Sequence, residues 1–152
     1  MRHLVTLLIA LALVRGLGAH EHEDHAVVPE TEHAADAAQA FDGPRESKGI
    51  AKIEPLASLD LTQDFPELKG RRLRARVIHL DPGAVVAVHE HQQRPGIAYV
   101  LEGEVVERRN DTDQPIVHGV GSFAIEHTGV VHWWTNATGT PARALVVDIV
   151  PE

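Results

Sequence analysis

Short runs of β-prone residues recur between turn signals from Leu73 to the end of the chain, and this pattern limits the fold more than any other feature. The turn signals include Asp81-Pro82-Gly83 and the polar stretch 110–113. Regularly spaced short strands favour an all-β sandwich or a small barrel. The less regular stretch 48–71 is expected to form a covering segment or a short edge strand with loops. The expected strands are 72–80, 84–91, 97–101, 105–109, 116–120, 122–125, 130–135 and 143–150.

The composition excludes several classes of function. A chain of 152 residues has room for one ordinary domain. The absence of cysteine excludes disulfides, thiolate zinc sites, iron–sulfur clusters and cysteine nucleophiles, so any bound metal needs nitrogen and oxygen ligands. A formal charge of −8 argues against general nucleic-acid binding, and no nucleic-acid partner is expected. The 11 histidines are the unusual count that remains to be explained.

Residues 1–19 have the pattern of a secretory signal peptide. Arg2 gives a basic start, an apolar run follows from Leu4 to Val14, and small residues end at Ala19. The apolar run is too short for a membrane-spanning helix, which needs about 20 residues. We therefore expect a periplasmic or secreted protein whose mature chain has no membrane span. The alternative is an amphipathic or buried helix at the N-terminus.

Residues 20–46 are expected to form a disordered, acidic tail rich in histidine. This stretch carries eight acidic residues and one basic residue, and it opens with the cluster His20-Glu21-His22-Glu23-Asp24-His25. Such a tract buries too little apolar surface to offset its chain entropy. The cluster is either a weak chelator of Zn, Cu or Ni or a solvated spacer with no specific role. The folded domain is then expected to span 47–152.

Two histidine motifs lie on the predicted strands. His89 and His91 are two residues apart, so alternation on a strand points both imidazoles to one face, with their Cα atoms roughly 6.7 Å apart. Two imidazoles at this spacing can converge on one metal ion. His132 follows a glycine turn and begins a strand that contains two tryptophans, and a barrel can bring it opposite the first pair.

These motifs resemble those of the cupin superfamily. The first cupin motif is matched by Gly83, the His89–His91 pair and Gly103, and the second is matched by Gly121, Gly129, His132 and Asn136, with seventeen residues between the motifs. The resemblance covers about residues 70–150. It implies a double-stranded β-helix, the jelly-roll barrel, with one metal inside, held here by His89, His91 and His132. It also implies a homodimer.

The sequence departs from the cupin pattern at two positions. The family glutamate, usually the fourth ligand, falls on Gly96, which has no side chain, and the family proline of the second motif falls on His127. Gln92 or Gln93 is a candidate for an additional ligand if its loop folds inward. Without the carboxylate, the site is expected to hold a divalent ion less tightly.

Four further residues are candidates for the lining of the pocket. Arg94 lies in the loop near the predicted site, where it can orient an anionic substrate, and His127 is a candidate outer partner of the ligands. Trp134 shares the strand face of His132 and is expected to line the barrel, and Tyr99 lies on a core strand. The plainer interpretation of both aromatic residues is core packing, and that of His127 is a surface residue.

The residues leave two classes of function open. Three neutral imidazoles bind Fe, Mn, Ni, Cu or Zn with little discrimination, so one divalent transition metal of unspecified identity is expected. Open metal positions suit a small-molecule enzyme of dioxygenase-like or isomerase-like chemistry. The alternative is a module that binds a metal or small ligand without turnover, since one fold hosts many functions. Some cupins lose the metal altogether, and the histidines would then only hydrogen-bond one another.

Overall fold

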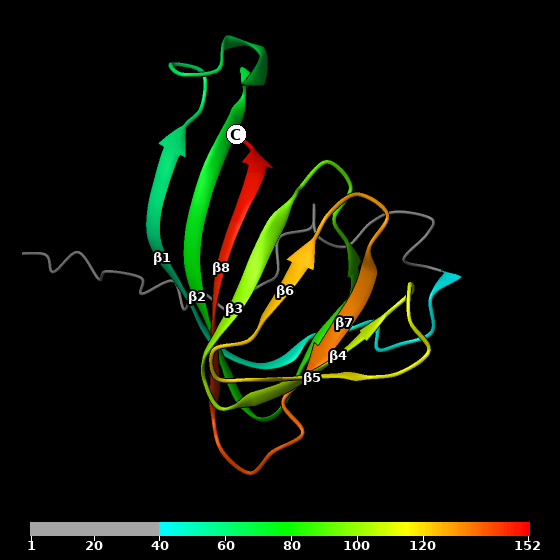
Figure 1. The fold of residues 1–152 in the computed structure, drawn as a ribbon. Helices are drawn as coiled ribbons and strands as arrows, with labels where there is room; N and C mark the ends of the chain where they lie inside the picture. Colours follow the sequence, from blue (N-terminus) through cyan, green and yellow to red (C-terminus); the bar gives the residue numbers. More distant parts are fainter. Residues whose placement is uncertain (1–39) are drawn as a thin grey trace, which may run out of the picture.

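The computed structural model describes residues 40–152, and it is built almost entirely of antiparallel strands (Figure 1). The predicted signal peptide and most of the predicted tail lie outside the described residues. Within the described part, no helix is long and apolar enough to cross a membrane. The elements are β1 (Lys48–Asp60), η2 (Pro66–Leu68), β2 (Arg71–Glu90), β3 (Gly96–Glu102), β4 (Glu104–Arg109), β5 (Ile116–Gly119), β6 (Phe123–Glu126), β7 (Val131–Thr135) and β8 (Ala142–Pro151).

The long strand β2 connects the two halves of the barrel. Its first half pairs with β1 and β8, and its second half pairs with β7. The sequence predicted two separate strands with a turn at Asp81-Pro82-Gly83. In the structure the chain only bends there and stays extended. Gly83 has a φ of 76°, which glycine adopts without strain, and Pro82 has no N–H to donate to a ladder. The bend therefore carries one strand from one half to the other.

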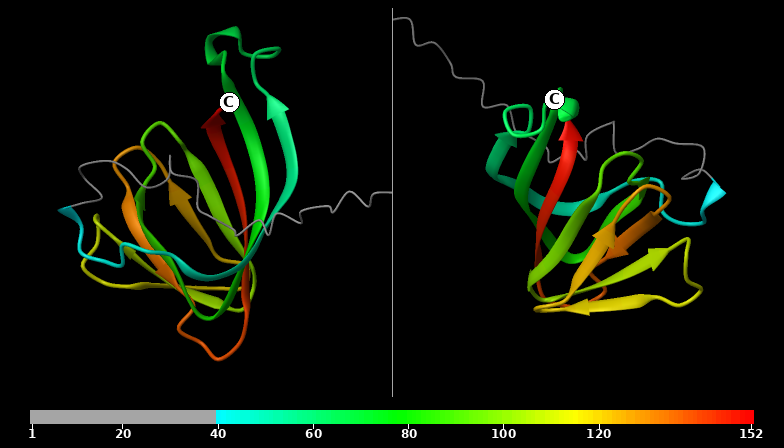
Figure 2. Two further views of the ribbon diagram at one scale, coloured as in Figure 1. Left: turned by 180° about the vertical axis from the view of Figure 1, so that it is seen from behind. Right: turned by 45° about the horizontal axis from the view of Figure 1, so that its top comes forward.

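The strands follow the order β5-β4-β7-β2-β8-β3-β6, and β1 lies off this path and pairs with β2. Figure 2 shows the two halves curving toward each other, with β2, β8, β3 and β6 on one side and β7, β4 and β5 on the other. This nearly closed antiparallel barrel is a double-stranded β-helix, which confirms the predicted fold class.

The first strand and the segment before it differ from expectation. A covering segment or a short edge strand with loops was predicted within 48–71, whereas β1 runs over 13 residues along β2. Residues 41–46 were assigned to the disordered tail, but they pack on the barrel: Phe41 lies against the cluster of Val88 and Val131, and the carbonyl of Pro44 accepts a hydrogen bond from the amide of Val88 at 2.9 Å. The buried apolar contact of Phe41 stabilises this ordered segment.

The main core cluster lies inside the barrel and reaches the histidines through Trp134. It consists of small and medium side chains around one aromatic ring, which are Leu80, Ala84, Ala98, Val100, Val105, Ala124, Trp134, Ala142 and Val146. Asn136 is fully buried beside this core, and its amide nitrogen donates to the carbonyls of Leu80, Asp81 and Thr140. Asn136 therefore ties the loop before β8 to the bend of β2, and this bend precedes the strand half that carries the histidine pair.

Candidate metal centre

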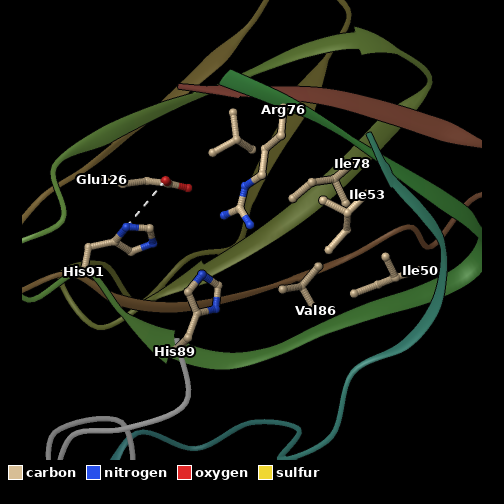
Figure 3. Close-up of a pocket in the computed structure, with 9 residues that line it drawn as sticks. Ile50, Ile53, Arg76, Ile78, Val86, His89, His91 and Glu126 are labelled. Atoms are coloured by element: carbon tan, nitrogen blue, oxygen red, sulfur yellow. Dashed lines mark ion pairs between the residues drawn. The ribbon is translucent and has the colours of Figure 1, made fainter. Parts of the chain in front are cut away.

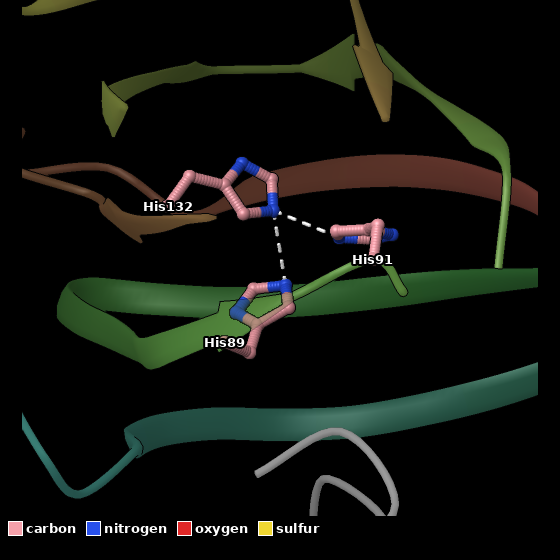
Figure 4. Close-up of side chains that lie close together, drawn as sticks. All are labelled: His89, His91 and His132. Carbon is pink, nitrogen blue, oxygen red and sulfur yellow. Dashed lines mark hydrogen bonds between the residues drawn. The ribbon is translucent and has the colours of Figure 1, made fainter. Parts of the chain in front are cut away.

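The three predicted histidines meet inside the barrel (Figure 4). His89 lies near the end of β2, His91 follows that strand directly, and His132 lies on β7, where its backbone pairs with that of His89. Nε2 of His132 lies 2.9 Å from Nε2 of His91 and 3.1 Å from Nε2 of His89. All three side chains are buried, and His132 has no exposed surface. The predicted convergence of the histidines is therefore confirmed.

The hydrogen-bond partners of the three rings are the basis for assigning the ring protons. Each Nδ1 lies beside an acceptor outside the cluster, so we assign the proton to Nδ1 in every ring. These acceptors are the carbonyl of Ala87 for His89 at 2.8 Å, the carbonyl of Arg94 for His91 at 3.3 Å, and the carboxylate of Glu107 for His132 at 2.5 Å. Each Nε2 then presents a lone pair to the other two, with no proton between them. A cation at this point removes the repulsion among the three lone pairs.

The spacing of the nitrogen atoms fits ligands of a single metal ion. Two imidazoles bound at right angles, each about 2.1 Å from one ion, place their nitrogens about 3.0 Å apart. The two measured separations, 2.9 and 3.1 Å, bracket this value. The donor set is neutral nitrogen, which suits Fe, Mn, Ni, Cu or Zn, as the sequence predicted. His89, His91 and His132 are the residues that would hold the ion.

A buried polar network lies behind His132. Glu107, which has no exposed surface, accepts hydrogen bonds from Nδ1 of His132, from Nε2 of His118 at 2.8 Å, and from the guanidinium of Arg109 at 3.3 Å. Trp134 stacks on His118, with ring centroids 5.0 Å apart. Nε1 of Trp134 lies 3.1 Å from Nδ1 of His132. Because the contact between Nδ1 and the Glu107 carboxylate is shorter, we assign the proton to Nδ1 of His132, which donates it to Glu107. Such a carboxylate orients a metal-binding imidazole and raises its basicity.

A small cavity opens beside His89 and His91 (Figure 3). Its volume is about 40 Å³. One wall is apolar and comes from β1, β2 and β8, with Ile50, Ile53, Ile78, Val86 and Val146. The opposite part is polar, with the carboxylate of Glu126 next to His91 and the guanidinium of Arg76 also lining the cavity. The cavity thus brings an apolar wall, a carboxylate and a cationic group next to the three nitrogens.

Burial sets the protonation of the site. It lowers the pKa of His91 to about 2, with further lowering from His132 and His89, and it holds the pKa of His132 well below its usual range. Both imidazoles are therefore neutral near pH 7 and able to bind metal. Burial has the opposite effect on a carboxyl group, and it raises the pKa of Glu126 to about 8, together with the charges of Glu107 and Asp148.

The loop candidates for an additional ligand point elsewhere. Gln92 and Gln93 are both exposed. The side-chain oxygen of Gln93 accepts a hydrogen bond from Arg71 at 2.8 Å, and the amide of Gln93 donates to the hydroxyl of Thr128 at 3.0 Å. These contacts hold the loop on the outside of the barrel. Neither glutamine lies with the histidines, which differs from the prediction.

The four candidates for the pocket lining divide into two groups. Tyr99 and His127 are exposed on the outer surface, so neither lines the cavity, which differs from the prediction. Nδ1 of His127 lies 2.9 Å from the carbonyl oxygen of Thr128 in its own loop. Strand parity explains Tyr99, since its neighbours Ala98 and Val100 are the buried ones. Arg94 is buried, and its carbonyl accepts from His91. Trp134 lies inside as predicted, in the core and behind His132.

Sequence reasoning missed two buried carboxylates of the site. Glu107 shares the inward face of β4 with buried Val105, and Glu126 shares the inward face of β6 with buried Ala124. Strand parity was the signal that could have found both residues, because the neighbouring strands were already placed. Most carboxylates in proteins are solvated, so acidic residues are not usually expected on an inward face.

The sequence of the barrel matches a known family. Residues 76–148 match the family model described as the cupin domain. The chain belongs to the cupin superfamily. A search of curated proteins finds no match. The predicted resemblance to cupins is thereby confirmed, and the match covers both histidine motifs.

Several solved structures share the cupin fold. The TT1209 protein of Thermus thermophilus has a TM-score of 0.51 and 24% identity, over 78% of this chain and 97% of its own. A Klebsiella pneumoniae protein described as having a double-stranded β-helix domain has a TM-score of 0.52 and 19% identity, over 71% and 89%. The cupin domain of an Enterobacter cloacae XRE-family transcriptional regulator has a TM-score of 0.50 and 16% identity, over 69% and 100%. At these identities the likeness concerns the fold alone.

Proposed function

We propose that this cupin binds one divalent transition metal through His89, His91 and His132. The observation that carries the proposal is the convergence of three buried imidazole nitrogens, while each Nδ1 has an acceptor outside the cluster and so leaves Nε2 available to a metal. A metal bound there would supply a Lewis acid and open positions for a small molecule. The chain's own contribution is to hold the three rings and to keep bulk water away from them.

The finer proposal is a small-molecule metalloenzyme of dioxygenase-like or isomerase-like chemistry. Its support is the cavity beside His89 and His91, which joins an apolar wall to the guanidinium of Arg76. The apolar wall accommodates the body of a small substrate, and Arg76 supplies positive charge, although that charge is shared with Asp148 at 3.5 Å. Glu126 is the acidic group of the cavity, and it lies next to His91.

The second candidate is a module that binds metal without turnover, and the size of the cavity favours it. A volume of about 40 Å³ holds only a few water-sized molecules, since one needs roughly 10–15 Å³. A substrate of ordinary size would have to displace the apolar wall formed in part by β1.

Metal content tests the shared part of both candidates. The purified protein, without added chelator, is expected to hold close to one transition-metal ion per chain in elemental analysis. Dialysis against a strong chelator should remove the ion, and restoring the metal at 100 times its Kd should raise the free energy of unfolding by about 2.7 kcal/mol. A protein that stays below about 0.1 ion per chain after exposure to each candidate metal would contradict the proposal.

Oxygen uptake separates the dioxygenase-like enzyme from the binding module. Iron-loaded protein is tested against phenolic, keto-acid and thiol substrates, with metal-free protein as the control. Uptake that requires both the metal and one substrate class supports the enzyme. If a compound binds but is neither consumed nor converted to an isomer, the result supports the module.

We also propose that the protein is exported. The support is the pattern of Arg2 followed by the apolar run from Leu4 to Val14, which is typical of a signal peptide. Expression of the full chain with fractionation of the cells tests this, and mass spectrometry locates the cleavage site. A full-length protein that remains in the cytoplasm would contradict export.

We further propose a homodimer formed through the outer face of β3 and β6. Ile97 pairs with Ile125 and Tyr99 pairs with Phe123 in the sheet register, and all four side chains are exposed. Contiguous apolar surface of this kind marks an interface, and β6 ends the sheet order. Ile97→Lys is expected to give a monomer by light scattering, and Leu56→Lys, at an exposed position of β1, is the control. A monomeric wild-type protein would contradict the dimer.

A further inference from the structure

The position of the missing family glutamate cannot carry a side chain in this barrel. A Cβ atom at Gly96 would lie 2.9 Å from Cβ of Asp148 and 2.9 Å from the carbonyl oxygen of Val147. Both neighbours belong to β8, which pairs with β3 directly, and one of the contact atoms is backbone. A glutamate at position 96 would therefore require β8 to shift. The absence of a carboxylate at this position follows from close packing between the two strands.

The residue opposite Gly96 supplies a carboxylate. Gly96 on β3 and Glu126 on β6 are register partners in the antiparallel ladder. Side chains of directly opposed residues project from the same face of a sheet, with Cβ atoms about 5 Å apart. A carboxylate from position 126 therefore enters the barrel beside the place that a side chain at 96 would occupy. The neighbouring strand can supply the same chemical group to the same region.

The contacts of Glu126 direct its carboxylate to the histidines. Oε2 lies 3.5 Å from Nδ1 of His91 (Figure 3). Oε1 lies 3.8 Å from Nε2 of His132. The residue is only 4% exposed, and Oε2 is buried without a hydrogen-bond partner. A buried carboxylate oxygen without a partner is costly, and a bound cation offsets that cost. An oxygen 3.8 Å from a ligand nitrogen is near enough to share its metal ion after a small side-chain rotation.

We propose that Glu126 is the fourth protein ligand of the metal held by His89, His91 and His132. The inference rests on the proposed metal function. It adds a carboxylate ligand from β6, whereas the family pattern places this ligand at position 96 on β3. A carboxylate gives the site a negative charge that three neutral imidazoles lack, so the ion is held more tightly than the sequence suggested. It also shifts the metal preference toward ions that favour oxygen, such as Mn²⁺.

Metal titrations of Glu126→Gln test this assignment. The variant keeps the shape of the side chain but loses its charge, so we expect its Kd for Mn²⁺ to rise at least about tenfold. The Kd for Ni²⁺, which imidazole suits well, should rise less. Glu102→Gln is the matched control, because Glu102 is exposed and paired with Arg143 on the outer surface. Thermal unfolding of the metal-free forms checks that each variant is folded.

The outcomes distinguish this inference from the metal function itself. Wild-type protein that binds neither Mn²⁺ nor Ni²⁺ overturns the metal function and the fourth ligand together. Wild-type protein that binds metal, with Glu126→Gln equal to Glu102→Gln in both titrations, overturns the fourth ligand alone. If Glu126→Gln does not fold, a crystal structure of Mn²⁺-loaded wild-type protein decides. A Glu126 oxygen within about 2.3 Å of the ion supports the ligand, and one beyond that distance contradicts it.

Discussion

Replacing His132 with alanine is expected to weaken metal binding by at least about 100-fold. His132 lies at the centre of the cluster, since its Nε2 is within 3.1 Å of Nε2 of both other histidines. Loss of a direct ligand should exceed the roughly 10–100-fold effect that is usual for groups behind a ligand. The measurement is competition with a chromophoric chelator. At a metal concentration that stabilises the wild type by about 2.7 kcal/mol, the variant should gain almost nothing.

His127→Ala is the matched control for this experiment. It removes the same side chain from an exposed position of the loop before β7, so the affinity for metal should stay at the wild-type value. If both His132→Ala and His127→Ala bound metal as tightly as the wild type, the three buried histidines would be a structural cluster rather than a metal centre. Equal loss in both variants would place the metal elsewhere in the chain.

Replacing Glu107 with glutamine is expected to weaken metal binding by about 10–100-fold although Glu107 does not bind the ion. The carboxylate accepts hydrogen bonds from His132, His118 and Arg109. The bond to Nδ1 of His132 orients that ring so that its Nε2 points toward the other two histidines. An amide has one acceptor oxygen, and its NH₂ group then faces a donor. We therefore also expect the free energy of unfolding of the metal-free protein to fall by about 1–3 kcal/mol.

Two measurements separate positioning of His132 from simple stabilisation by Glu107. Metal affinity is measured by chelator competition at a temperature where the variant is fully folded, and Glu102→Gln serves as the exposed control. The absorption spectrum of Co²⁺-loaded protein, which reports the ligand geometry, should also change in Glu107→Gln. A variant that is less stable but has the wild-type affinity and spectrum would show that Glu107 stabilises the barrel without orienting the ligand.

Strand alternation made the histidine cluster predictable. His89 and His91 share a strand face at a spacing of two, and the match to both cupin motifs indicated that His132 comes from the opposite strand. The same rule applied to Glu107 and Glu126 would have placed both inside, next to Val105 and Ala124. Neither residue was among the site candidates predicted from the sequence. Whether a carboxylate is buried depends on partners from other strands, and no local pattern contains them.

The bend of β2 illustrates a second limit of local patterns. Asp81-Pro82-Gly83 has the composition of a chain reversal, and a pattern of proline and glycine cannot tell a reversal from a bend within a strand. The backbone at Gly83 donates to the carbonyl of Asn136, which lies far along the chain, directly after β7. That contact belongs to the closed barrel. The length of β1 was missed for a related reason, because an edge strand is defined by its partner.

The sequence alone determined the all-β class and the choice of the three histidines as candidate ligands. Strand alternation and motif spacing are local properties, so they can be recognised without the tertiary structure. Only the tertiary structure decided what surrounds those histidines. Three features depend on which strands become neighbours. They are the close packing around Gly96, the register that places Glu126 opposite Gly96, and the three hydrogen-bond donors around Glu107. Pairing between distant segments fixes those neighbours, and it follows from the burial of the whole barrel rather than from any one segment.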